Sequence, residues 1–220
     1  MLYDKDEGAL IMIIEYSLEK EESLMQHTME ETYGKLLLTK LFTHVWFGDW
    51  GQYENSIKQF PNGLVDAFPF HPFYDRKITH FWYDNYFLNP GTYFIPLYVS
   101  HYITLTNQEK EQTRQDLIQL TKNIDEKDFP HPLDIEKFPD HVGSLTAFIA
   151  IAAKKEVEAT KAQDNDLAEQ MVYLQKHIFE SCLEVAIKQL WYYNRDKIQD
   201  PFFKEFIPFY LFAMEDLRYT

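Results

Sequence analysis

The sequence predicts an all-α protein, built as a single helical domain of two lobes that are joined by an acidic, proline-rich hinge. Three observations support this prediction. The 220 residues include only 7 glycines but 18 phenylalanines, 15 tyrosines and 4 tryptophans, a balance that favours helices packed through aromatic side chains. Apolar residues recur every three or four positions in several long segments, which is the helical period. No long segment alternates apolar and polar residues, as a half-buried strand would.

The first part of the chain combines a long helical pattern with a segment that is rich in breakers. The helical pattern runs from Ala9 to about Val45, and only Gly34 interrupts it, so one long helix or two consecutive helices both fit. Residues 46–75 contain repeated glycines and prolines. They predict a loop-rich aromatic segment with at most short helices, because these residues break regular structure.

The middle of the chain predicts two helices and the hinge. Residues 78–88 form the first helix, which Asn89-Pro90-Gly91 ends, and residues 109–124 form the second. Residues 125–140 hold three prolines and six acidic residues, which is typical of a connector. The lobes are therefore expected at about residues 1–124 and 141–220. The buried side of the first helix is expected to carry Phe81, Trp82, Tyr86 and Phe87.

The last third of the chain predicts three helices. Residues 145–153 present an apolar helical face, and a polar connection follows near residues 159–165. The next helix has about twenty residues, and the last begins at Pro201 and is expected to kink at Pro208. The buried stripe of the twenty-residue helix is predicted to consist of Leu167, Met171, Leu174, Ile178, Cys182, Val185 and Gln189.

The charge balance limits the classes of partner. There are 21 basic and 35 acidic side chains, and the formal net charge is −14, so non-specific binding of nucleic acid is disfavoured and a cationic peptide or basic protein is attracted. Cys182 is the single cysteine, which excludes an intramolecular disulfide and a four-cysteine zinc site. The acidic start of the chain and the short apolar run after it do not fit a secretory signal or a membrane span. A cytoplasmic protein without membrane insertion is expected.

The sequence shows no pattern that is typical of catalysis. No two of the eight histidines have the i, i+4 spacing of a helical metal site, and there is no H-E-x-x-H motif. Phosphate-binding loops and the G-x-S-x-G elbow are also absent, since Gly48-Asp49-Trp50-Gly51 lacks both a lysine and a preceding strand. Cys182 lies on an apolar helical face, where a buried inert thiol is expected. We therefore predict no catalytic residue, no metal ligand and no cofactor.

Three segments, taken in order, resemble a known family. They are Tyr86-Phe87 followed by residues 96–102, the short helix around residues 114–120, and Phe138-Pro139-Asp140-His141-Val142-Gly143 before an apolar helix. This order resembles the TorD/DmsD/NarJ family of redox-enzyme maturation chaperones over about residues 80–217. Two departures from the family pattern are Leu145, where many relatives have a glutamate, and Val99-Ser100-His101, which replaces Glu-Ser-Val.

The resemblance implies a non-catalytic cytoplasmic chaperone that binds the twin-arginine signal peptide of a molybdenum-containing oxidoreductase. It would hold back Tat export until the cofactor is inserted, and its partners would be the leader and the body of the catalytic subunit. An acidic helical protein with many aromatic residues agrees with this role, since carboxylates bind guanidinium groups and apolar walls bind the apolar part of a leader. Two alternatives remain open, a general helical adaptor for another basic peptide and a metal-dependent helical hydrolase.

The expected peptide-binding residues gather around the predicted hinge. Asp140 either accepts hydrogen bonds from a peptide arginine or caps the helix that follows, and both roles are compatible. His141 is either a pH-responsive peptide contact or a first-turn histidine bonded to a hinge carbonyl. Pro139 is expected to fix the hinge backbone. The complete predicted set is Pro139, Asp140, His141, Tyr98, Ser100 and Trp82.

The aromatic and acidic candidates also have structural alternatives. Tyr98 and Ser100 either line the peptide groove or belong to a turn in which Tyr98 packs into the core. Trp82 and Trp46 are candidates for a groove wall because large aromatic side chains anchor peptides, and core packing is the other interpretation. The acidic hinge residues form either a collar for the cationic peptide or a solvated run; they are Asp125, Glu126, Asp128, Asp134 and Glu136.

Overall fold

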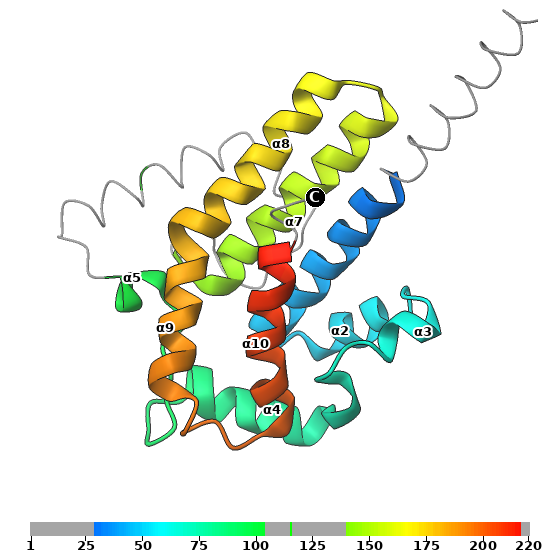
Figure 1. Cartoon of the computed structure of the whole chain (residues 1–220). Helices are drawn as coiled ribbons and strands as arrows, with labels where there is room; N and C mark the ends of the chain where they lie inside the picture. Colours follow the sequence, from blue (N-terminus) through cyan, green and yellow to red (C-terminus); the bar gives the residue numbers. More distant parts are fainter. Residues whose placement is uncertain (1–28, 104–114, 116–139, 217–220) are drawn as a thin grey trace, which may run out of the picture.

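The structure, a computed structural model, describes residues 29–103, residue 115 and residues 140–216 (Figure 1). All regular structure among these residues is helical, apart from one isolated β-bridge between Tyr98 and His141. The all-α prediction is therefore confirmed. The predicted helix over residues 109–124 and the hinge over residues 125–140 lie outside the described residues except for Gln115 and Asp140. The division into two lobes stays a prediction.

A helix over residues 29–46, blue in Figure 1, agrees with the second half of the predicted first helix. Three short helices follow, namely α2 (Trp50–Ile57), α3 (Asn62–Val65) and the 3₁₀ turn η1 (His71–Phe73), as expected for the breaker-rich segment. Gly48 adopts a positive φ of 65° beside the Tyr83 ring. A side chain there would place its Cβ 2.6 Å from that ring, so glycine lets the chain leave the first helix.

The helix predicted over residues 78–88 is α4 (Arg76–Tyr83) followed by the π turn η2 (Asp84–Leu88). Asp75 starts α4 by accepting hydrogen bonds from two backbone amides of the first turn. The prediction that Phe81 is buried is wrong, because its side chain is 58 % exposed while Thr79 and Tyr83 occupy the buried face. Trp82 is only half-buried. The four-residue helix α5 (Val99–Tyr102) comes next in the described chain.

The second half begins with a helical hairpin of α7 (Val142–Lys161) and α8 (Asn165–Ile178). The π turn η4 (Phe179–Leu183) then continues directly into α9 (Glu184–Asn194), so the helix predicted to have about twenty residues is longer and contains a π turn. This turn holds an extra residue and rotates the buried face of α9 by one position. Val185 is therefore 45 % exposed, and Ala186 and Ile187 are buried in its place.

The last helix, α10 (Pro201–Asp216), contributes four fully buried aromatic side chains to the core, namely Phe202, Phe203, Phe206 and Tyr210. Asp200 accepts a hydrogen bond from the Phe203 amide at its start, and the helix continues through Pro208. Phe206 and Tyr210 meet Trp46 of the first helix with ring centroids 5.1 Å and 5.3 Å apart. One apolar cluster therefore joins residues from both sides of the predicted hinge.

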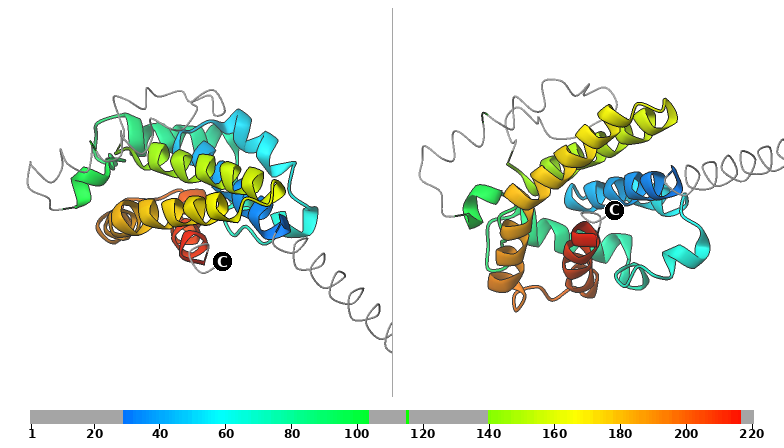
Figure 2. Two further views of the ribbon diagram at one scale, coloured as in Figure 1. Left: turned by 90° about the horizontal axis from the view of Figure 1, so that it is seen from above. Right: turned by 45° about the horizontal axis from the view of Figure 1, so that its top comes forward.

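The helices that neighbour α7 can be followed in Figure 1. α7 and α8 lie side by side, and the helix over residues 29–46 runs beside α7, as the views of Figure 2 also show. Gly143 lies at the start of α7 against the Phe47 ring, where a Cβ would come within 2.6 Å of a ring carbon. The absence of a side chain at residue 143 thus allows the chain after the first helix to approach α7 closely.

Candidate functional site

A short backbone pairing joins the two segments in which most of the predicted site residues lie. The Val99 amide donates to the Asp140 carbonyl oxygen at 2.9 Å, and the Val142 amide donates to the Leu97 carbonyl oxygen at 2.8 Å. Tyr98 and His141 consequently form an antiparallel β-bridge. We call Tyr98, Asp140 and His141 the bridge corner. It brings together residues about forty positions apart in the sequence, immediately before α7.

His141 holds the bridge corner together. Its Nδ1 accepts a hydrogen bond of 3.0 Å from the Gly143 amide, and this makes His141 the N-cap of α7. The hypothesis that Asp140 is the cap is therefore wrong by one residue. The His141 ring stacks on Phe47 with centroids 5.6 Å apart and meets the Tyr98 ring edge-to-face at 5.5 Å. The side chain is 7 % exposed and so is part of the packed interior.

Asp140 and Tyr98 are the solvent-accessible residues of the bridge corner. Asp140 is half-buried, and Tyr98 is 36 % exposed. Within the described residues no donor bonds to the Asp140 carboxylate. Burial raises the pKa of Tyr98 and of Cys182, and the negative charge of Asp140 raises both further. The carboxylate therefore lies within electrostatic range of both residues, and the Cys182 thiol is buried and protonated, as the sequence predicts for an inert cysteine.

The remaining predicted site residues have different positions. Ser100 is half-buried in α5, two residues after Tyr98. Trp82 belongs to another aromatic group, because its ring stacks on Tyr86 at 5.2 Å and meets Tyr93 at 5.6 Å. Among the described residues, no ring contact of Trp82 reaches Tyr98 or His141. Trp46 is fully buried, so it is a core residue and not a groove wall. Pro139 and the five acidic hinge residues lie outside the described residues.

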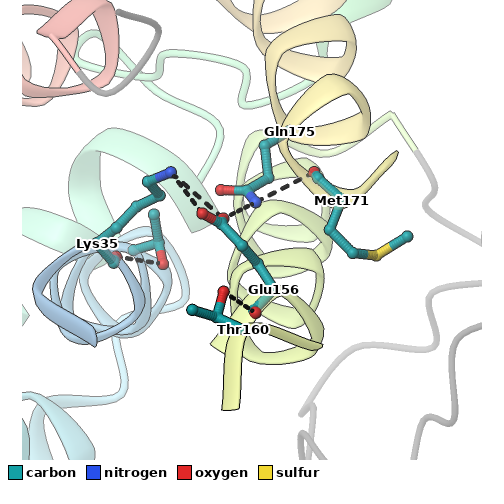
Figure 3. Close-up of polar contacts among 6 residues, drawn as sticks. Lys35, Glu156, Thr160, Met171 and Gln175 are labelled. Carbon is teal, nitrogen blue, oxygen red and sulfur yellow. Dashed lines mark hydrogen bonds and ion pairs between the residues drawn. The ribbon is translucent and has the colours of Figure 1, made fainter. Parts of the chain in front are cut away.

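A buried polar cluster joins three helices, and the sequence patterns did not reveal it (Figure 3). The Lys35 ammonium donates to both carboxylate oxygens of Glu156, at 3.1 Å and 3.3 Å, and Gln175 Nε2 donates to Oε2 of the same carboxylate at 2.6 Å. Lys35 comes from the first helix, Glu156 from α7 and Gln175 from α8. The side chains of Lys35 and Glu156 are 5 % and 7 % exposed.

One signal in the sequence could have indicated this cluster. Glu156 lies seven residues after Ile149 and three after Ala153, so it shares the apolar face of α7. A carboxylate on such a face requires a buried partner, because an unpaired charge is strongly disfavoured in the interior. The sequence alone could not identify that partner, since Lys35 lies 121 positions away on a different helix.

The described part of the chain offers no evident site for a metal ion. Within it no group of three or more His, Cys, Asp or Glu side chains is arranged to hold one. Nor does any of its helices combine the length and the apolar character needed to cross a bilayer.

One of the comparisons with known proteins gives a family match. The family described as nitrate reductase delta subunit matches residues 80–184 of this chain. No curated protein and no solved structure gives a match. The matched segment contains all three residues of the bridge corner as well as Glu156, Gln175 and Cys182, whereas Lys35 and α10 lie outside it.

Proposed function

We propose that the chain binds the twin-arginine signal peptide of a molybdenum-containing oxidoreductase in the cytoplasm, because the nitrate reductase delta subunit family, which is a family of NarJ/TorD-type chaperones, matches its residues 80–184. Members of the family are chaperones of reductase assembly and are not enzymes themselves. We infer that the chain is likewise a chaperone of molybdoenzyme maturation, with a catalytic subunit as its partner. In our proposal the peptide is held during cofactor insertion and is released for Tat export afterwards.

The observation that carries the proposal is the β-bridge between Tyr98 and His141, inside the matched segment. In this pairing the half-buried Asp140 carboxylate lies within electrostatic range of Tyr98, whose side chain is 36 % exposed. A guanidinium group binds a carboxylate through two parallel hydrogen bonds and also packs flat on an aromatic face. The bridge corner therefore suits an arginine side chain better than a lysine side chain.

The charge of the whole chain favours any cationic leader over a neutral or acidic one. With a formal net charge of −14, the protein attracts a leader that has two arginines and few acidic residues. Such long-range attraction raises the association rate and weakens as the salt concentration rises. The affinity itself depends more on partly desolvated contacts, of which the Asp140 carboxylate is the candidate within the described residues.

The test is a fluorescence titration with labelled leader peptides. The wild-type protein should bind a leader with Arg-Arg more tightly than the same leader with Lys-Lys. Asp140→Asn should lower the affinity for the Arg-Arg leader by about tenfold, which is the usual effect of losing one charge-assisted contact. Helicity and thermal stability should remain unchanged, because the backbone carbonyl of Asp140, and not its side chain, bonds to Val99. Asp196→Asn is the matched control, since Asp196 is an exposed aspartate in the loop after α9.

Two other outcomes would contradict the proposal in different ways. Equal affinity for the two leaders, both weakened by Asp140→Asn, would favour a general adaptor for basic peptides. Equal binding by Asp140→Asn and Asp196→Asn would reject the bridge corner as the peptide site. His141→Ala is the structural comparison, because it removes the N-cap of α7 and should lower thermal stability.

A further inference from the structure

A small cavity adjoins the buried cluster of Lys35, Glu156 and Gln175. Its volume is about 20 Å³, and Lys35, Gln175 and Lys176 contribute to its walls. The apolar part of its described lining consists of Ile149, Val172, Phe179 and Met214. These residues come from the first helix, α7, α8, η4 and α10. The cavity therefore lies where the first helix meets the α7–α8 hairpin and the last helix.

The Lys35 ammonium has at least one hydrogen without an acceptor among the described residues. An ammonium group carries three hydrogens and can only donate. Both of its contacts, at 3.1 Å and 3.3 Å, are to the carboxylate of Glu156. The Lys35 side chain is 5 % exposed, so bulk solvent does not supply the missing acceptor. Because a buried donor without a partner is strongly disfavoured, the free hydrogen requires an acceptor inside the cavity.

The Gln175 side chain lacks a donor in the same place. Its Nε2 donates to Glu156 at 2.6 Å and to the Met171 carbonyl oxygen at 3.1 Å, so both amide hydrogens are used. Its Oε1 accepts no hydrogen bond from a described residue, and Figure 3 shows this oxygen pointing toward Lys35. Gln175 is 7 % exposed. The cavity thus has a buried donor and a buried acceptor in its walls, and both belong to side chains that bind the same carboxylate.

The size and the chemistry of the cavity select its ligand. One water molecule needs a cavity of roughly 10–15 Å³, so a volume of about 20 Å³ admits one water and excludes an organic ligand. A cation would be repelled by Lys35, and an anion would be repelled by Glu156. Water is neutral, and it can accept a hydrogen bond from Lys35 while it donates one to Gln175.

We propose that this cavity is a binding site for one ordered water molecule, which bridges the Lys35 ammonium and Gln175 Oε1. Among the described residues that line the cavity only Lys176 is exposed, so the water would enter beside it. A single bound water does not screen charges as bulk solvent does, and the pair of Lys35 and Glu156 stays desolvated. The water would add a second link between the first helix and α8, beside the link through Glu156.

A crystal structure of the full chain, at a resolution that shows ordered water, tests the proposal directly. We expect one peak within about 2.7–3.2 Å of both Lys35 Nζ and Gln175 Oε1. Crystals grown with bromide as the halide identify the alternative ligand, because bromide gives an anomalous signal and water does not. An anomalous peak in the cavity, or no peak at all, would overturn the proposal.

Val172→Leu tests the site in solution, because Val172 lines the cavity and the added volume competes with the water. Displacing an ordered water by an apolar group loses its hydrogen bonds. The Tm should therefore fall by about 2–4 °C, which corresponds to the loss of about one hydrogen bond. Filling an empty cavity would instead raise the Tm.

Val185→Leu is the matched control for this measurement. It makes the same substitution at a helical position of α9 that is 45 % exposed, and so it measures the effect of the change in helix propensity alone. The Tm of Val172→Leu should lie below that of Val185→Leu, and the crystal structure of Val172→Leu should lack the peak. If Val172→Leu is as stable as the control or more stable, the cavity holds no water that the cluster needs, and the proposal is rejected.

Discussion

The buried ion pair between Lys35 and Glu156 allows the packing argument to be tested quantitatively. Glu156→Gln removes the negative charge but keeps the size and one oxygen acceptor, so the Lys35 ammonium remains buried without a counter-ion. Breaking a buried pair in this way costs about 3–5 kcal/mol. Gln175 can still donate to the Met171 carbonyl oxygen at 3.1 Å. We therefore expect a loss of about 3 kcal/mol in the free energy of unfolding.

Urea and thermal denaturation, followed by circular dichroism, measure this loss. For a chain of this length about 3 kcal/mol corresponds to a decrease in Tm of about 6–12 °C. The double variant Lys35→Met/Glu156→Leu should be within about 1 kcal/mol of the wild type, because an apolar pair avoids the desolvation penalty of both charges. Lys188→Met is the surface control. The Lys188 side chain is 50 % exposed and its ammonium bonds to Glu184 and Glu215, so the expected cost is below about 1 kcal/mol.

Two outcomes would refute this reasoning. If Glu156→Gln costs no more than Lys188→Met, then the Lys35 ammonium reaches water and the pair is not buried in solution. If the apolar double variant is as unstable as Glu156→Gln, the cluster is needed for its hydrogen bonds to α8 and not only for charge compensation. The unfolding data for these variants distinguish the two explanations.

Two further predictions concern the first helix and the start of α7. Gly143→Ala should lower the free energy of unfolding by about 1–3 kcal/mol, because the new Cβ would come within 2.6 Å of the Phe47 ring. Gly34→Ala should instead be stabilising, since no atom lies within 4 Å of its Cβ position. An equal effect at both positions would contradict the prediction. Burial lowers the pKa of His44 to about 4, so the folded protein binds fewer protons than the unfolded chain between about pH 4 and pH 6.5. Stability should fall with decreasing pH across this window, by up to about 3 kcal/mol, and His44→Gln should flatten the dependence; parallel profiles for the two proteins would exclude His44 as the cause.

The helices could be predicted from the sequence because their signals are local. The apolar period identifies α7 and α8, and Asp200-Pro201 marks the start of α10 through an N-cap and a first-turn proline. The face that each helix buries was less predictable. The π turn η4 rotates the chain, and no residue pattern announces it, so the expected stripe failed at Val185. It also failed at Phe81 and Leu167, which are 58 % and 37 % exposed and precede the π turns, because the apolar period alone does not show which turns of a helix the rest of the protein covers.

The candidate site was predictable only in part, for a related reason. The motifs around Tyr98 and Asp140 stand out in the sequence, but their pairing is a long-range contact that local propensity does not encode. The same holds for the N-cap. A histidine is not a usual cap, so Asp140 was the better expectation, and only the geometry shows that His141 Nδ1 accepts the Gly143 amide.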